Sequence, residues 1–74
     1  MKHNKIKSTI IESVGYDTTS KTLEVKFRNG AVYEYYNVNM GKHIGIMTAP
    51  SAGTYLTKNI EPNHKYKRQP VRKS

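Results

Sequence analysis

Residues 22–35 read TLEVKFRNGAVYEY, and they fix the centre of the architecture. Polar and apolar side chains alternate in the first half, so Leu23, Val25 and Phe27 share one face of a strand. The Asn-Gly pair that ends at Gly30 is a strong hairpin signal. It allows either a two-residue turn or a three-residue loop with this glycine in the left-handed conformation.

The two loop lengths give different pairings of the strands. The three-residue loop places Val25 opposite Tyr33, whereas the two-residue turn places Val25 opposite Glu34. We favour the three-residue loop because it keeps all the large apolar side chains on one face, and a slip of one residue would send them to water. This pairing also sets Glu24 opposite Glu34 on the outer face, which is an unfavourable pair.

A further strand is expected before this hairpin, within residues 9–16, which read TIIESVGY and are rich in β-branched side chains. Ile10 and Val14 share one register and Ile11 the other, so its buried face is left open. The strand that ends the hairpin is expected to run from residue 31 to 38.

Two short helices are expected after the strands. Asn39 is placed to cap the first, and Pro50 ends it. Ser51 is placed to cap the second, and Pro62 ends that one. The inward-facing positions are expected to be Met40, Ile44 and Met47 in the first helix, and Ala52, Tyr55, Leu56 and Ile60 in the second.

The sequence therefore predicts one α+β domain: a three-stranded antiparallel β-meander followed by one or two short helices packed on one face. With 74 residues and no cysteine, the chain can form only one small core without disulfides. We expect residues 8–61 to form the domain, between a basic N-terminal segment (1–7) and a basic tail (62–74) that is extended or mobile. No apolar run suits a signal peptide or a membrane span, so we expect a soluble, cytoplasmic protein.

The net charge of +8 lies entirely in the two ends. Residues 8–57 carry four basic and four acidic groups and are neutral overall. Basic ends on a neutral body are typical of a protein that binds a polyanion, most simply a nucleic acid, since Lys and Arg release counterions from phosphates. A solubilising tail is the alternative.

Tyrosines extend this hypothesis, because exposed rings can stack on unpaired bases. Tyr33 and Tyr35 are expected to be core residues, with base stacking as the alternative. Tyr36 points to the outer face, where it and Lys26 would form an aromatic and basic surface. The remaining candidate nucleic-acid contacts are Lys58, Lys65, Tyr66, Lys67, Arg68, Arg72 and Lys73.

The sequence offers little for catalysis. The histidines, His3, His43 and His64, are far apart, and no Asp or Glu lies at a ligand spacing from any of them. We expect neither a metal site nor a cofactor, and no enzyme.

The ordered set Ser13-Val14-Gly15-Tyr16-Asp17, Leu23-Glu24-Val25-Lys26-Phe27, Asn29-Gly30, Tyr33-Glu34-Tyr35, Val38, Ala49-Pro50-Ser51, Gly53-Thr54-Tyr55-Leu56 and Ile60 resembles the KTSC domain. That family is named for its occurrence at the carboxyl terminus of some lysyl-tRNA synthetases, and it has small stand-alone bacterial and phage members. Its central mark is a Tyr-x-Tyr motif, here Tyr33 and Tyr35. The resemblance implies about three strands followed by helical segments, and RNA binding has been proposed for the family.

Two functions follow as hypotheses. The first is a non-catalytic module that binds RNA, or single-stranded nucleic acid more broadly, through the basic ends and tyrosines. The second is a protein-interaction module, such as a phage or mobile-element product that binds a host protein. A monomer and a homodimer are both open, because edge strands in a small sheet invite pairing between subunits.

Overall fold

The computed structural model describes residues 3–69, and they form one antiparallel sheet backed by helices. The strands lie side by side in chain order. They are β1 (His3–Lys5), β2 (Ile11–Asp17), β3 (Thr22–Phe27), β4 (Val32–Tyr35) and β5 (Tyr66–Gln69). The α+β class and the antiparallel sheet are as predicted, but the number of strands was wrong: the sheet has five strands and not three. The two additional strands are the edge strands β1 and β5, which lie in the segments expected to be the basic ends.

The β3–β4 hairpin has the predicted pairing. Leu23 lies opposite Tyr35 and Val25 opposite Tyr33, and Glu24 faces Glu34. Gly30 has φ +94°, a conformation that favours glycine, and the Phe27 amide donates to the Ala31 carbonyl at 2.8 Å to close the loop. The three-residue loop is therefore confirmed.

A β-bulge in β2 settles which residues of the predicted strand at 9–16 are buried. The pairing with β3 shifts between Ile11 and Ser13. Because the bulge adds a residue on one strand, Ile11 and Val14 are both fully buried, although their spacing does not fit a regular strand. Ile10 lies outside β2 and is 51% exposed.

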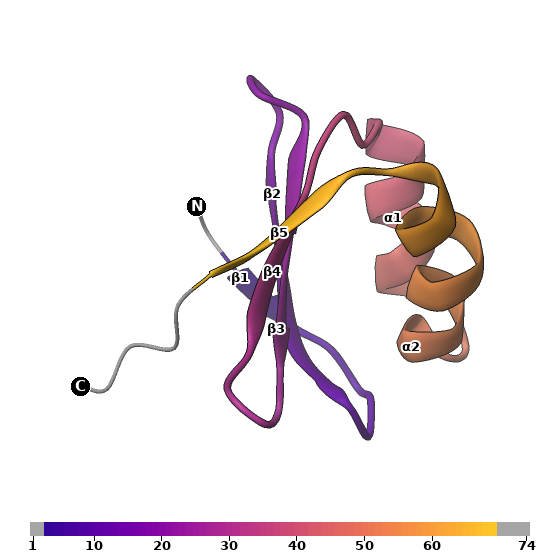
Figure 1. Cartoon of the computed structure of the whole chain (residues 1–74). Coiled ribbons are helices and arrows are strands. Elements are labelled where there is room, and N and C mark those ends of the chain that lie inside the picture. The colour runs from indigo at the N-terminus through magenta and orange to yellow at the C-terminus, as the bar shows by residue number, and fades with distance from the viewer. Residues whose placement is uncertain (1–2, 70–74) are drawn as a thin grey trace.

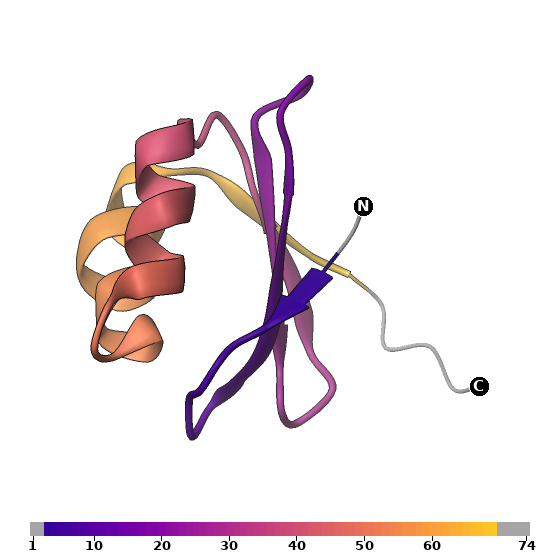
Figure 2. The same ribbon diagram turned by 180° about the vertical axis from the view of Figure 1, so that it is seen from behind.

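Helices cover only one face of the sheet, as the two opposite views show (Figure 1 and Figure 2). They are α1 (Met40–Thr48), α2 (Ala52–Tyr55), the π-helical turn η1 (Leu56–Ile60) and the 3-10 turn η2 (Glu61–Asn63). Both predicted caps are present: Asn39 Oδ1 accepts from the Lys42 amide at 2.9 Å, and Ser51 Oγ accepts from the Thr54 amide at 3.4 Å.

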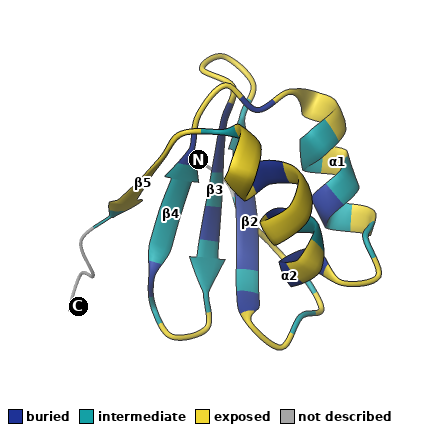
Figure 3. Ribbon diagram, turned by 45° about the vertical axis from the view of Figure 1, so that its right-hand side comes forward, coloured by how far each residue is buried: buried dark blue, intermediate teal, exposed yellow. Residues whose placement is uncertain are grey.

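The core lies between the helices and the middle strands, and the outward faces of the helices are exposed (Figure 3). It consists of Ile11, Val14, Leu23, Val25, Tyr35, Val38, Ile46, Ala52, Leu56 and Ile60. Two expected members are missing, since Met40 is 45% and Ile44 54% exposed. Ile46 takes their place because α1 turns its Gly45 side against the Tyr55 ring, a contact that hydrophobic spacing does not register.

Candidate nucleic-acid interface

Strand β5 brings part of the basic tail into the folded body. It pairs with β4, placing Tyr66 opposite Tyr35, Arg68 opposite Tyr33 and Lys67 opposite Glu34. Directly opposed residues of paired strands share a face. Tyr66 and Arg68 therefore lie on the helix side of the sheet, and Lys67 lies on the open side.

Four aromatic rings meet on the helix side of β3, β4 and β5. The Tyr66 ring lies 5.4 Å from Tyr33 and 5.5 Å from Tyr35 between centroids, and Phe27 meets Tyr33 edge to face at 5.4 Å. These residues, Phe27, Tyr33, Tyr35 and Tyr66, are called the aromatic cluster below. Tyr66 is 51% exposed and Tyr35 only 2%. The cluster thus has one ring in the core and one ring open to a partner.

Charges adjust the chemistry of this cluster. The Arg68 guanidinium carbon lies 6.0 Å from the centre of the Tyr33 ring, within the range of a cation–π contact. Burial, with the nearby Glu61 carboxylate adding to it, raises the pKa of Tyr35 far above its ordinary value of 10.0. Tyr35 is therefore a neutral phenol that can donate a hydrogen bond.

The other candidate cations are spread over the molecule. Lys65 is exposed just before β5, and its carbonyl accepts from the Tyr36 amide at 2.9 Å. Lys58 is exposed on η1, beside a hollow shared with the residue 8–10 loop, and it stands apart from the aromatic cluster. Arg72 and Lys73 lie outside the described residues. The structure thus brings Tyr66 and Arg68 together with Tyr33 and Tyr35, with Lys65 and Lys67 flanking them in the chain.

The open face of the sheet carries Tyr36 and Lys26, each held by a carboxylate. The Tyr36 hydroxyl donates to Glu34 at 3.2 Å, and the Lys26 ammonium lies 3.3 Å from a Glu12 oxygen. Partial burial first, and the Glu34 bond second, raise the pKa of Tyr36. This face therefore has mixed charge rather than a basic surface.

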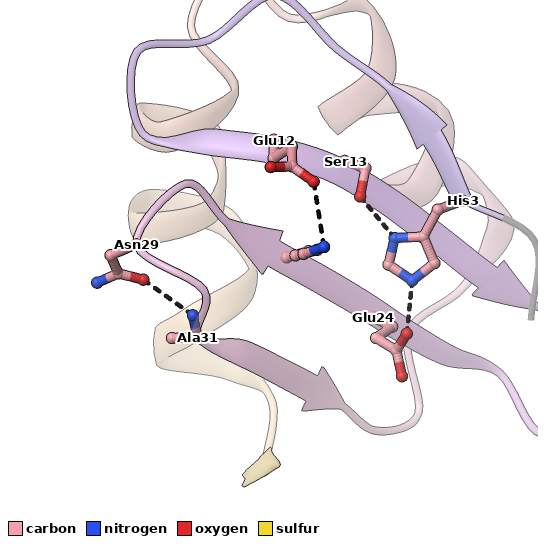
Figure 4. Close-up of polar contacts among 7 residues, drawn as sticks. His3, Glu12, Ser13, Glu24, Asn29 and Ala31 are labelled. Carbon is pink, nitrogen blue, oxygen red and sulfur yellow. Dashed lines mark hydrogen bonds and ion pairs between the residues drawn. The ribbon is translucent and has the colours of Figure 1, made fainter. Parts of the chain in front are cut away.

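The open face also gathers a serine, a histidine and a glutamate that the sequence spacing did not connect (Figure 4). His3 Nε2 lies 2.5 Å from Glu24 Oε1, and His3 Nδ1 lies 2.8 Å from Ser13 Oγ. In the neutral imidazole, Nε2–H donates to the carboxylate and the serine hydroxyl donates to Nδ1. A hydrolase triad also joins a serine, a histidine and a carboxylate, but there Nε2 bonds the serine and Nδ1 the carboxylate, the reverse of the arrangement here. Ser13 is moreover only 5% exposed and sits mid-strand. The trio joins β1, β2 and β3 through side-chain hydrogen bonds.

The other two histidines have separate surroundings. His64 donates from Nδ1 to the Tyr36 carbonyl at 3.0 Å and accepts at Nε2 from the Lys42 ammonium at 2.8 Å. His43 stacks on Tyr16, with ring centres 4.8 Å apart, and burial lowers its pKa. Within residues 3–69 no three His, Cys, Asp or Glu side chains are grouped so that they could hold a metal ion.

Over the same part of the chain, every helix is too short or too polar to cross a membrane.

Fold and site together define a small α+β domain: a five-stranded meander, helices on one face, and an aromatic cluster built around a Tyr-x-Tyr pair at the β5 edge. The KTSC domain model matches residues 7–66, and the chain belongs to this family. The structure is similar to the crystal structure of a KTSC domain protein from Yersinia pestis, with a TM-score of 0.88 and 28% identity over 93% of this chain and 97% of that one. KTSC is a small domain with no known catalytic role.

The curated proteins that this chain resembles include long enzymes and a small protein of similar length. The chain is 36% identical over 62 residues to a lysine–tRNA ligase of Trichormus variabilis, covering 84% of this chain and 11% of the ligase. It is 33% identical to an uncharacterized protein of Stutzerimonas stutzeri, covering 86% of this chain and 90% of that protein. The chain thus spans about a tenth of the ligases it matches and nearly the whole of a small relative.

Proposed function

We propose that this chain is a small non-catalytic module that binds single-stranded nucleic acid, RNA foremost, at the β5 edge of its sheet. The observation that carries the proposal is the β4–β5 pairing. It sets the exposed Tyr66 ring and Arg68 beside Tyr33 on one face. A cytoplasmic location goes with this function.

The aromatic cluster supplies the base contacts in this proposal. An exposed ring next to a guanidinium suits unpaired bases of any sequence, because every base has a π-face. Each stacked base contributes about 1 to 3 kcal/mol by alanine substitution. Tyr66 is the ring available for this contact, since Tyr35 is buried in the core.

The cations next to Tyr66 supply the phosphate contacts. Lys65, Lys67 and Arg68 are all exposed. Because side chains alternate along β5, Arg68 shares the face of Tyr66 and Lys67 lies on the opposite face, so cations lie on both faces of this strand. The match to lysine–tRNA ligases supports RNA as the partner, since the name of those enzymes states that they act on tRNA.

A second candidate function, a protein-interaction module, is favoured by a different surface. Met40 and Ile44 on α1 have exposed apolar side chains. Ile10, the residue just before β2, is exposed as well. Exposed apolar groups are typical of protein contacts when they form one patch. Binding to a protein through such a patch would depend little on salt, unlike binding to phosphates.

Fluorescence anisotropy of labelled single-stranded RNA, duplex RNA and heparin tests the first function. We expect single-stranded RNA to bind tightest at physiological salt. Changing Lys65, Lys67 and Arg68 together to Gln should weaken binding to all RNA sequences and lower the slope of log K against log salt by about 2. Circular dichroism establishes that each variant is folded.

The matched control changes Lys5, Lys7 and Lys21 to Gln, which removes the same charge away from β5. We expect a smaller loss of affinity for this control. Equal losses in the two triple variants, or equal binding of RNA and heparin, would reduce the interaction to unspecific attraction and refute the β5 site.

A further inference from the structure

A hollow of about 320 Å³ opens beside the aromatic cluster on the helix side of the sheet. This volume is at the low end of small-molecule sites and suits one ring system rather than several nucleotides. The lining includes Phe27, Asn29, Tyr33, Tyr35, Glu61 and Arg68. It is called the Tyr35 hollow below.

The hydroxyl of Tyr35 belongs to the most buried of the residues that line the hollow. The residue is 2% exposed and lines the hollow. Because burial raises the pKa of Tyr35, its hydroxyl stays protonated and can donate a hydrogen bond to a polar group bound in the hollow.

The remaining polar groups of the hollow define what that ligand presents. Glu61 brings a carboxylate, which accepts two hydrogen bonds side by side. Asn29 uses its Oδ1 to accept from the Ala31 amide at 3.0 Å, which leaves its NH₂ group as a donor (Figure 4). The hollow thus offers a pair of acceptors and separate donors, next to the Tyr33 ring and Arg68.

Building on the function proposed above, we propose that the Tyr35 hollow holds one guanine base of a single-stranded nucleic acid, with its paired N–H donors on Glu61 and its carbonyl on Tyr35 or Asn29. Guanine presents two adjacent donors, N1–H and the N2 amino group, next to the O6 acceptor. Adenine and cytosine present one amino group beside acceptors, and uracil one N–H between two carbonyls. Only guanine matches both oxygens of a carboxylate.

The test measures binding of the full chain to labelled uridine decamers that carry one central G, A, C or inosine. Inosine is guanosine without the N2 amino group, so it removes one hydrogen bond to Glu61. We expect the G decamer to bind about tenfold or more tighter than the inosine decamer, because hydrogen bonds to charged groups are the strong ones.

Glu61→Gln separates recognition from charge. It should bring the ratio of G to inosine affinity close to one, while the affinity for the all-uridine decamer stays equal or rises, since a negative charge near phosphates is removed. Glu34→Gln makes the same charge change on the open face and should leave the ratio unchanged. Tyr35→Phe removes only the hydroxyl and should weaken the G decamer several-fold.

The outcomes distinguish the two proposals. Decamers that all bind with equal affinity overturn the guanine site and leave the single-strand function standing. A G preference that survives Glu61→Gln also overturns the assignment to this hollow. If no decamer binds more tightly than heparin does, both proposals fail.

Discussion

Replacing Gly45 with alanine sets two well-measured effects against each other. In a helix interior, alanine is favoured over glycine by up to about 1 kcal/mol of folding free energy. A methyl group at Gly45, however, would lie 3.0 Å from Cε2 of Tyr55 and closer still to the ring carbon Cζ and the hydroxyl oxygen. Ordinary van der Waals contact begins near 3.4 Å.

The packing effect is expected to be the larger. Tyr55 packs against the core between α1 and α2, so its ring must move, or the two helices must separate, to admit the methyl group. Extra methyl groups in a packed contact cost about 1 to 3 kcal/mol. After the gain in helix propensity, Gly45→Ala should lower the free energy of unfolding by about 1 kcal/mol.

Urea denaturation of the full chain measures this change, and Gly41→Ala is the control in the same helix. The methyl group at Gly41 would meet only Asn39 Oδ1, at 3.3 Å, so this variant should be neutral or slightly stabilising. In a Tyr55→Leu background, the cost of Gly45→Ala should largely disappear. If Gly45→Ala stabilises the protein as much as Gly41→Ala does, the packing argument is refuted.

Three further predictions concern single positions. Both ring nitrogens of His43 are buried without a partner, and burial lowers its pKa below the ordinary 6.5. As the pH falls, the unfolded chain therefore binds a proton at His43 before the folded chain does. The stability contributed by neutral His43 is complete above about pH 6.5 and falls as the pH drops below it. His43→Phe should make the urea midpoint depend less on pH in this range. Gly30→Ala forces a residue with a side chain into φ +94° and should lower the free energy of unfolding by about 1 to 2 kcal/mol. An unchanged melting temperature in this variant would contradict the loop geometry. Asn39→Ala removes the α1 cap and should cost about 1 kcal/mol, most of which Asn39→Ser should restore in the same denaturation assay.

The centre of the fold could be predicted because its signals are local. The alternation around Val25 and the Asn-Gly pair at residues 29–30 together fix the strand pairing, and both lie within one short segment. The caps Asn39 and Ser51 were found for the same reason, since a cap acts on amides three residues away.

The edge strands could not be predicted, because nothing in their own sequence favours a strand. His3–Lys5 and Tyr66–Gln69 are polar and basic, and their pairing depends on β2 and β4 offering a free edge. The same limit hid the trio of His3, Ser13 and Glu24, whose members meet only once the sheet is assembled.

The aromatic cluster was visible in part. The Tyr-x-Tyr pair could be identified from the sequence, and Tyr66 stood out among the basic residues that follow Pro62. The contact between Tyr66 and that pair depends on the β4–β5 pairing across the whole helical segment, which no local pattern encodes. Sequence alone therefore indicated the participants and not their arrangement.

The strict chain order of the sheet has a consequence for how the protein folds. Strands β2, β3 and β4 are joined by short turns, whereas β4 and β5 are separated by roughly 30 residues of helix and turn. Closing the longer loop costs about 1.8 kcal/mol more chain entropy, because that cost grows with the logarithm of loop length. Strand β5 should therefore join the sheet after β2–β4 and leave it before them, so that its amides exchange with solvent through a partial opening that spares β2–β4. The proposed binding edge is then less stable than the β2–β4 centre of the sheet, and a bound strand of nucleic acid would slow the exchange of β5 more than that of any other strand.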